Sequence, residues 1–233
     1  MQIKQRLVYP AWKTPYFFIK SLTIFFKLLN TGILIPLIQN NFFNKRILLI
    51  LKILNFVFAN KKDKEVGKKL LECLINLGPG YIKFGQALST RPDLVGKQTC
   101  NYLKSLQDNI KPISNSVAKK IILNENEKFF KENLAYFDEE PIASASVAQV
   151  HKGILKDGDK VAIKILKPNI QKQLFKDFIF FYWITKCLEF RIPNIKRLKL
   201  SKNVEILSEV SLNELDLTLE ASAADELAEN FKD

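Results

Sequence analysis

Several lysines in this sequence could bind phosphate, and several carboxylates could hold those lysines in place. Binding a nucleoside triphosphate needs a fixed cation close to the phosphates and a carboxylate that holds this cation in place. Lys164 ends the apolar run 161–163 and fits the first role. Glu220, on a later predicted helix, fits the second, and Asp216, one helical turn earlier, is the runner-up.

The acidic residues Glu214, Asp216 and Glu220 fall on one helix predicted over 204–231. On ideal helical geometry Asp216 and Glu220 share a face, whereas Glu214 lies about 200° around from Asp216. We therefore expect Glu214 and Asp216 to contact different partners. The plain alternative for all three side chains is a solvated acidic face.

A second candidate cation, Lys83, lies on a short helix predicted after the Gly78-Pro79 break. Gly78 suits a helix C-terminus, and Pro79 cannot continue the preceding helix. Spacing of i, i+3 and i+7 predicts a buried face made of Tyr81, Phe84 and Leu88. Lys83 and Gln86 would then project together from another side. The alternative is an ordinary amphipathic helix with a solvated lysine.

A β-hairpin is predicted to position Lys164. Branched residues predict strands near 146–155 and 160–166, and Asp157-Gly158 between them is a strong turn signal. His151, the one histidine of the sequence, falls in the first strand and is interpreted as a strand residue rather than a catalyst. The remaining apolar spacing predicts helices over 66–77, 94–110, 117–133, 170–190 and 204–231.

The order of four motifs strongly resembles the UbiB/ADCK family of atypical, kinase-like proteins. The motifs are Lys83-x-Gly85-Gln86, an Ala/Ser-rich stretch, Val-Ala-Ile-Lys164 and Glu214-x-Asp216, and the resemblance runs from about residue 70 onward. It implies an α+β fold, in which a mainly helical N-terminal region precedes a partial protein-kinase-like N-lobe. This N-lobe would have a small antiparallel sheet and an αC-like helix, and these 233 residues hold no C-lobe.

Three regions follow from this resemblance and from the composition. We expect a basic, apolar helical extension at 1–62, a helical region with the Lys-x-Gly-Gln motif at 63–135, and the partial N-lobe at 136–233.

The resemblance also implies how nucleotide would bind. Ordinary kinases cover the phosphates with a glycine-rich loop, whereas the UbiB family has an alanine-rich loop, whose Cβ atoms narrow the approach of the backbone. The implied cofactor is ATP or ADP with Mg²⁺, and serine hydroxyls could still bind phosphate. Glu220 would pair with Lys164, and the Lys83 helix would lie across the same cleft, near the Glu-x-Asp motif. The implied ATP-binding residues are Ile142, Ala143, Ser144, Ala145, Ser146, Val147, Ala148, Gln149, Val150 and Lys164.

The sequence departs from the kinase pattern in its catalytic residues. A kinase needs a catalytic-loop aspartate and an Asp-Phe-Gly that holds Mg²⁺, but no Asp-Phe-Gly occurs here and His151 precedes Lys164. A lesser departure is Ala223, where the family usually has asparagine. We therefore assign no catalytic residue and no metal ligand, and expect no phosphoryl transfer by these residues alone. Three hypotheses stay open: one half of a split ATPase completed by a separate chain supplying the C-lobe, a non-catalytic membrane-associated module, or an inactive truncated product.

The positive charge of the chain is concentrated at its N-terminus. The net charge is +12, yet residues 1–62 carry ten Lys or Arg and no Asp or Glu. Basic and apolar residues interleaved on helices favour an interfacial position on anionic lipid. The alternative is a helical hairpin packed on the rest of the protein with its lysines at the surface. Nucleic acid would also attract this charge, but no recognition motif accompanies it.

The expected location is therefore peripheral, on the cytoplasmic face of a membrane. No apolar run reaches the roughly 20 residues of a spanning helix. The three cysteines have no paired spacing, so neither a disulfide framework nor a zinc site is predicted. The family resemblance implies support of ubiquinone biosynthesis with ATP, with a prenyl lipid or quinone-biosynthesis enzymes as partners.

Overall fold

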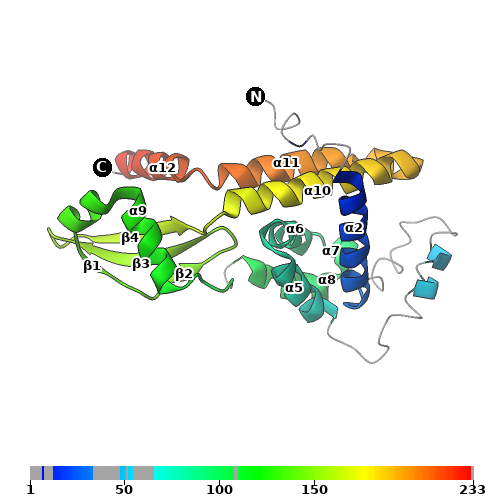
Figure 1. The fold of residues 1–233 in the computed structure, drawn as a ribbon, viewed down its shortest axis with the longest axis horizontal. Coiled ribbons are helices and arrows are strands. Elements are labelled where there is room, and N and C mark those ends of the chain that lie inside the picture. Colours follow the sequence, from blue (N-terminus) through cyan, green and yellow to red (C-terminus); the bar gives the residue numbers. More distant parts are fainter. Residues whose placement is uncertain are drawn as a thin grey trace. The chain divides into compact units, whose positions relative to one another are not determined.

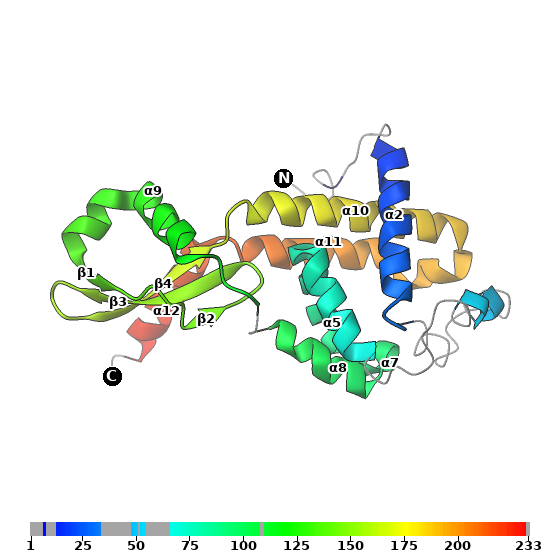
Figure 2. The same ribbon diagram turned by 60° about the horizontal axis from the view of Figure 1, so that its bottom comes forward.

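The computed structural model describes residues 13–33, 48–50, 52–54, 66–107 and 110–231, together with Leu7 and without the side chains of 193–194. Two compact units divide the chain: Ala11–Ile170 forms one, and Gln171–Asp233 with Met1–Pro10 forms the other. Figures 1 and 2 show the elements of both units.

The first part of the larger unit is a cluster of helices. α5 packs against α6 and α8, and α2 lies against α5 (Figure 1). α6 also packs against η2. Their shared core is aliphatic, with Leu70, Leu74, Leu103 and Leu106 at most 2% exposed. The predicted helix at 66–77 and the helix start after Gly78 are confirmed. The elements are α2 (Thr14–Leu29), α5 (Val66–Leu77), α6 (Pro79–Ser89), α7 (Pro92–Val95), α8 (Lys97–Leu103) and η2 (Lys104–Leu106).

The single helix predicted over 94–110 is wrong. Gly96 has φ +82°, a backbone conformation that ends α7 and begins α8, and the helix after it tightens into the 3-10 turn η2. Glycine adopts this conformation at little cost because it has no Cβ. The apolar spacing across 94–110 therefore reflects a broken path around the same core.

The buried face of α6 also differs from the prediction. Phe84 is 43% exposed and Lys83 only 8%, so the stripe of Tyr81, Phe84 and Leu88 is not the packed face. The reason is Gly85: a Cβ built there would lie 2.5 Å from Leu106 Cδ1 and 2.7 Å from Leu74 Cδ1. The helix approaches its neighbours through the residue with no side chain, and this rotates Phe84 outward.

The second part of the larger unit is a four-stranded antiparallel sheet preceded by a helix. β3 is central: β4 pairs along one edge from Ala148 to Ile154, and β1 and β2 pair at opposite ends of the other. The predicted hairpin is confirmed, with Gly158 at φ +99° in its turn, whereas β1 and β2 were not predicted. The elements are α9 (Asn115–Asn133), β1 (Leu134–Phe137), β2 (Ala143–Ser144), β3 (Ala148–Leu155) and β4 (Lys160–Leu166).

One face of this sheet is covered by α9 (Figure 1). Ala118 and Ile122 of the helix form a buried cluster with Ile165 of β4, and Ile163 and Phe137 pack against its edge. Because side chains alternate along a strand, the residues that follow the same alternation as Ile163 and Ile165 lie under the helix. Those at the intervening positions, including Lys164, point to the opposite face.

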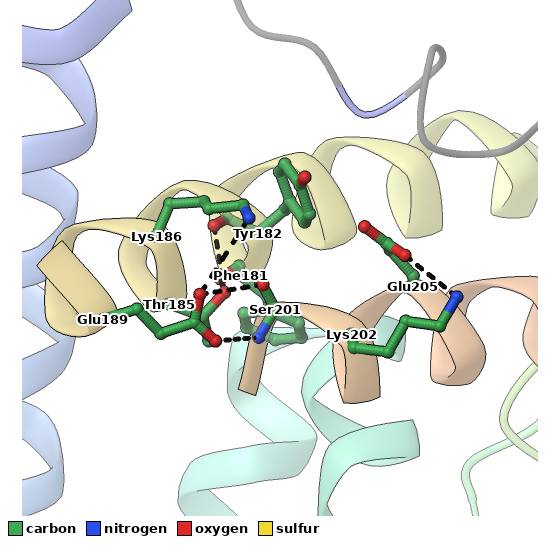
Figure 3. A network of polar contacts seen from close by, with 8 residues as sticks. All are labelled: Phe181, Tyr182, Thr185, Lys186, Glu189, Ser201, Lys202 and Glu205. Carbon is green, nitrogen blue, oxygen red and sulfur yellow. Dashed lines mark hydrogen bonds and ion pairs between the residues drawn. The ribbon is translucent and has the colours of Figure 1, made fainter. Parts of the chain in front are cut away.

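The smaller unit contains a pair of helices that lie side by side in both views (Figures 1 and 2). α10 (Ile170–Arg191) is followed by η3 (Pro193–Leu198) and by α11 (Leu200–Asn213), which confirms the predicted helix at 170–190. Glu189 of α10 accepts hydrogen bonds from the amide and the hydroxyl of Ser201, each at 2.9 Å (Figure 3). A carboxylate from one helix thus satisfies first-turn donors of the next.

Further polar contacts lie along α10 next to Glu189. Lys186 lies 3.9 Å from the Glu189 carboxylate, and its ammonium is 5.3 Å from the Tyr182 ring centroid (Figure 3). Burial raises the pKa of Tyr182, and the nearby Glu205 carboxylate raises it further.

The continuous helix predicted over 204–231 is also wrong. It is divided into α11 and α12 (Leu217–Asn230) by a turn at Glu214–Asp216. Asp216 is the N-cap of α12, and its carboxylate accepts a hydrogen bond from the Thr218 amide at 3.1 Å. An aspartate at this position favours helix initiation because its side chain satisfies an orphan backbone donor. The apolar spacing of the sequence gave no sign of this break between α11 and α12.

The close packing around Gly85 should decide whether an alanine at this position stabilises or destabilises the protein. At an open helical site, Gly→Ala stabilises a helix by about 1 kcal/mol. At Gly85 the added methyl would overpack against Leu74 and Leu106, which costs about 1–3 kcal/mol. We therefore expect Gly85→Ala to lower the unfolding free energy measured with urea.

Leu106→Ala provides the matched test of this contact. In a double-mutant cycle, Gly85→Ala should destabilise the Leu106→Ala background less than the wild-type chain, because the shortened side chain leaves room for the methyl. A stabilising Gly85→Ala substitution would contradict the packing.

Candidate functional site

The strand register places Lys164 on the sheet face that points away from α9. Lys164 of β4 lies directly opposite Val150 of β3, and Ala162 lies opposite Lys152. Directly opposed residues of an antiparallel pair project to the same side. The Lys164 face, as we call it, includes the half-buried Val150 and Ile154 and the exposed Lys152, Lys160, Ala162 and Lys164.

The two faces of the hairpin therefore differ in chemistry. The covered face holds Gln149, His151 and Ile165, each at most 4% exposed. The Lys164 face holds three lysines beside a short apolar surface. Lys164 stands in the middle of β4 on the face that points away from α9, and its side chain is exposed.

The Ala/Ser-rich stretch leads directly into this face. Ile142, 64% exposed, precedes Ala143 and Ser144 of β2, and Ala148 to Val150 open β3. Ala145, Ser146 and Val147 connect the two strands in a tight turn, closed by a 2.9 Å hydrogen bond from the Ala145 amide to the Ala148 carbonyl. Sequence-predicted residues 142–150 and Lys164 thus belong to one continuous piece of sheet.

The serine hydroxyls of this stretch are turned inward. Ser146 is 4% exposed, and Ser144 Oγ is buried with no hydrogen-bond partner among the residues that the structure describes. Burying an unpaired hydroxyl is costly. The hydroxyls are therefore not presented to solvent in this conformation.

Gln149 and His151 form a buried polar chain under α9. The Ile113 amide donates to Gln149 Oε1 at 2.8 Å, which turns the Gln149 amide nitrogen toward His151 Nε2, 2.7 Å away. His151 Nε2 must then accept, so its Nδ1–H donates to the Asp138 carbonyl at 2.9 Å. The ring stacks on Phe137, with centroids 4.7 Å apart. His151 is therefore a structural strand residue, as predicted, and the Gln149 side chain is committed to the covered face.

Lys167 was not predicted as a site residue. Its ammonium donates to the Ala145 carbonyl at 2.7 Å and to the Lys111 carbonyl at 3.1 Å, and its amide donates to the Val147 carbonyl at 2.9 Å. Burial lowers its pKa below the ordinary lysine value. The sequence offers no direct signal for this role, because Lys167 lies just after the strand and its partners are backbone atoms.

Two residues of the Lys-x-Gly-Gln motif have a structural role in packing α6. Gly85 permits the close approach of α6 described above, and Gln86 donates its side-chain amide to the Leu106 carbonyl at 2.8 Å. Both residues therefore dock α6 on its neighbours. Lys83 is buried on the same helix.

The acidic residues lie in the smaller unit. Glu214 is the C-cap of α11, Asp216 the N-cap of α12 and Glu220 lies in the first turn of α12. Hydrogen bonds from the Thr218 hydroxyl and amide lower the pKa of Asp216. The face shared by Asp216 and Glu220 was inferred from an unbroken helix, which the structure does not have. Pairing of Lys164 or Lys83 with these carboxylates stays a prediction.

No magnesium ligand is assigned in this chain. Among the described residues, no group of three or more His, Cys, Asp or Glu could hold a metal ion. Magnesium prefers octahedral oxygen ligands, of which substrate phosphates can supply several.

The sequence is similar to that of a known protein family and of several of its members. Residues 105–233 match the family model described as "ABC1 atypical kinase-like domain". "Probable protein kinase UbiB" of Cellvibrio japonicus (strain Ueda107) is 39% identical over 165 residues, 71% of this chain and 30% of that protein. The proteins of the same description from Shewanella sp. (strain ANA-3) and Aliivibrio fischeri (strain ATCC 700601 / ES114) are 37% and 38% identical over 180 and 179 residues. In both cases the match covers 76% of this chain and 33% of the relative.

The chain thus spans about one third of the length of these curated relatives. The family match covers the sheet, the Ala/Ser-rich stretch, Lys164 and the acidic residues of α11 and α12. By this match and the motif order, the chain belongs to the UbiB-type family of ABC1 atypical kinase-like proteins.

Proposed function

We propose that this chain supplies the nucleotide-binding N-lobe of a UbiB-type atypical kinase or ATPase that supports ubiquinone biosynthesis at a membrane. The observation that carries the proposal is the Lys164 face, where an exposed lysine stands beside an apolar surface at the end of the Ala/Ser-rich stretch. The family membership supports the same assignment.

The residues of this face would divide the work of binding ATP or ADP. Val150 and Ala162 lie on the same side of the sheet and offer an apolar floor for the base. Lys164 would place its ammonium on the phosphates, as the corresponding strand lysine does in kinases. The turn at 145–147 would limit the approach of the phosphates, because its Cβ atoms occupy space that glycines leave open.

The chemistry beyond binding would require further residues. A catalytic aspartate and metal ligands of the kind that kinases use would come from another part of the protein or from a separate chain. Prenyl-quinone intermediates and the enzymes that act on them are the proposed partners, because the relatives are UbiB proteins.

Mg-ADP binding tests the nucleotide site. Lys164→Met removes the ammonium and should weaken Mg-ADP binding by about 10-fold or more, the scale of a charge-assisted hydrogen bond. Lys120→Met is the control, because Lys120 is an exposed lysine on α9, the helix that covers the opposite face of the sheet. Titration calorimetry with the full 233-residue chain measures both. Equal affinities for wild type and Lys164→Met would refute the assignment.

The proposed ion pair between Lys164 and Glu220 has a separate test. If Glu220 holds Lys164 in place, Glu220→Gln should weaken Mg-ADP binding several-fold in the wild-type background and have no effect in Lys164→Met. Glu226→Gln, an exposed position on the same helix, is the matched control. An equal effect of Glu220→Gln in both backgrounds would show that the carboxylate acts elsewhere.

A second function, association with an anionic membrane, is favoured by α2. One side of this helix buries Phe17 and Ile24, whereas five large apolar residues on the other side are 38–64% exposed. On ideal geometry these five residues span an arc of about 120°. The exposed residues are Phe18, Ile19, Leu22, Phe25 and Phe26.

The surroundings of this exposed apolar face are basic. Lys13, Lys20 and Lys27 lie on or beside α2, which contains no acidic residue. No helix among the described residues has the length and apolarity needed to cross a bilayer. An apolar face with flanking lysines fits the interface of anionic lipid, where both kinds of side chain find favourable surroundings.

Liposome flotation tests the membrane proposal. We expect the wild-type chain to float with phosphatidylglycerol vesicles and far less with phosphatidylcholine vesicles. The triple variant Phe18→Ser, Ile19→Ser, Leu22→Ser should lose flotation, because it removes the apolar contact. Ile206→Ser, Val210→Ser, which alters exposed apolar residues of α11, should float as wild type does. Equal binding to both lipids would eliminate the electrostatic part of the proposal.

A further inference from the structure

A single lysine outside the predicted site holds the turn of the Ala/Ser-rich stretch. Lys167 contacts two of the turn's carbonyl groups: its ammonium binds that of Ala145 at 2.7 Å, and its amide binds that of Val147 at 2.9 Å. Carbonyl oxygens are good acceptors for an ammonium, which has three donors and no acceptor. The carbonyls of Ala145 and Val147 are therefore both bound by Lys167, the residue that directly follows β4.

The same ammonium also joins the turn to the segment before α9. Lys167 donates to the Lys111 carbonyl at 3.1 Å. On either side of Lys111, the Ile110 amide donates to the Ser144 carbonyl at 3.3 Å and the Ile113 amide to Gln149 Oε1 at 2.8 Å. Segment 110–113 is thus hydrogen-bonded to the start of β3, to β2 and to Lys167. These bonds hold the turn in addition to the pairing of β2 with β3.

The orientation of the turn's peptide groups follows from these bonds. In a trans peptide the carbonyl and the next amide point in opposite directions. Holding the Ala145 carbonyl on Lys167 therefore aims the Ser146 amide to the other side of the peptide plane. A loop that binds phosphate through backbone amides needs such fixed amide directions before the ligand arrives.

We propose that Lys167 is a positioning residue for the nucleotide loop, which it clamps by binding the Ala145 and Lys111 carbonyls together. The clamp itself is a property of the free chain, and its effect on nucleotide rests on the proposed function. Half-burial of this side chain and the lowered pKa that follows from it agree with an ammonium enclosed by the backbone groups it binds. Lys167 would contact no nucleotide; it would set the shape of the loop that does.

Amide hydrogen exchange of the nucleotide-free chain tests the clamp. Lys167→Met keeps the length and apolar stem of the side chain and removes its donors. We expect exchange in residues 143–148 and 110–113 to rise about 10-fold or more, while α5 and α6 keep wild-type protection. Lys167→Arg, which retains charged donors, should restore most of the protection, and Lys160→Met should leave it unchanged. Wild-type exchange in Lys167→Met would overturn the proposal.

Mg-ADP titration of the same variants tests the consequence for nucleotide. We expect Lys167→Met to bind about 10-fold more weakly and Lys167→Arg to bind nearly as wild type does, a rescue that simple loss of packing would not give. Unchanged affinity in Lys167→Met would refute the positioning role. If the wild-type chain binds no Mg-ADP, the proposed function fails, and the exchange experiment still decides whether the clamp exists.

Discussion

The pairing of β3 with β4 beneath α9 is the constraint on which the candidate site depends. Alternation along a strand leaves two possible faces, and the helix removes one of them by burying Ile165 against Ala118 and Ile122. Lys164, adjacent to Ile165, must then face away from α9. Moving β4 by one residue along β3 would place a lysine among isoleucines, so the hydrophobic contact with α9 also determines which side chain of β4 points to the other face of the sheet.

Much of this arrangement could be predicted from the residues. The Asp157-Gly158 turn and the branched residues around it located the hairpin to within two residues, because turn chemistry and alternation are local signals. The helix break at Gly78 was likewise local. β1 and β2 escaped prediction because strands of four and two residues carry too little periodicity of their own and form by pairing with β3.

The missed features of the site depend on tertiary contacts. α6 packs through Gly85 because a residue without a side chain allows the closest approach to Leu74 and Leu106, and Phe84 is left exposed although it is hydrophobic. Lys167 acts on backbone carbonyls that any residues could provide, so no motif reveals it. Gln149 lies within the predicted ATP-binding stretch, but strand alternation turns its side chain to the covered face. The order of the motifs was enough to predict the region of the candidate site, but the role of each side chain depends on how the elements pack.

The junction between α11 and α12 has a consequence for the Glu-x-Asp motif. Glu214 ends one helix and Asp216 begins the next, so the two carboxylates belong to different helices separated by Leu215. Glu220 shares its segment with Asp216. A change in the backbone torsions at Leu215 would swing Asp216 and Glu220 together while Glu214 stayed with α11. The distance between the carboxylates of Glu214 and Asp216 would then change with the angle between α11 and α12.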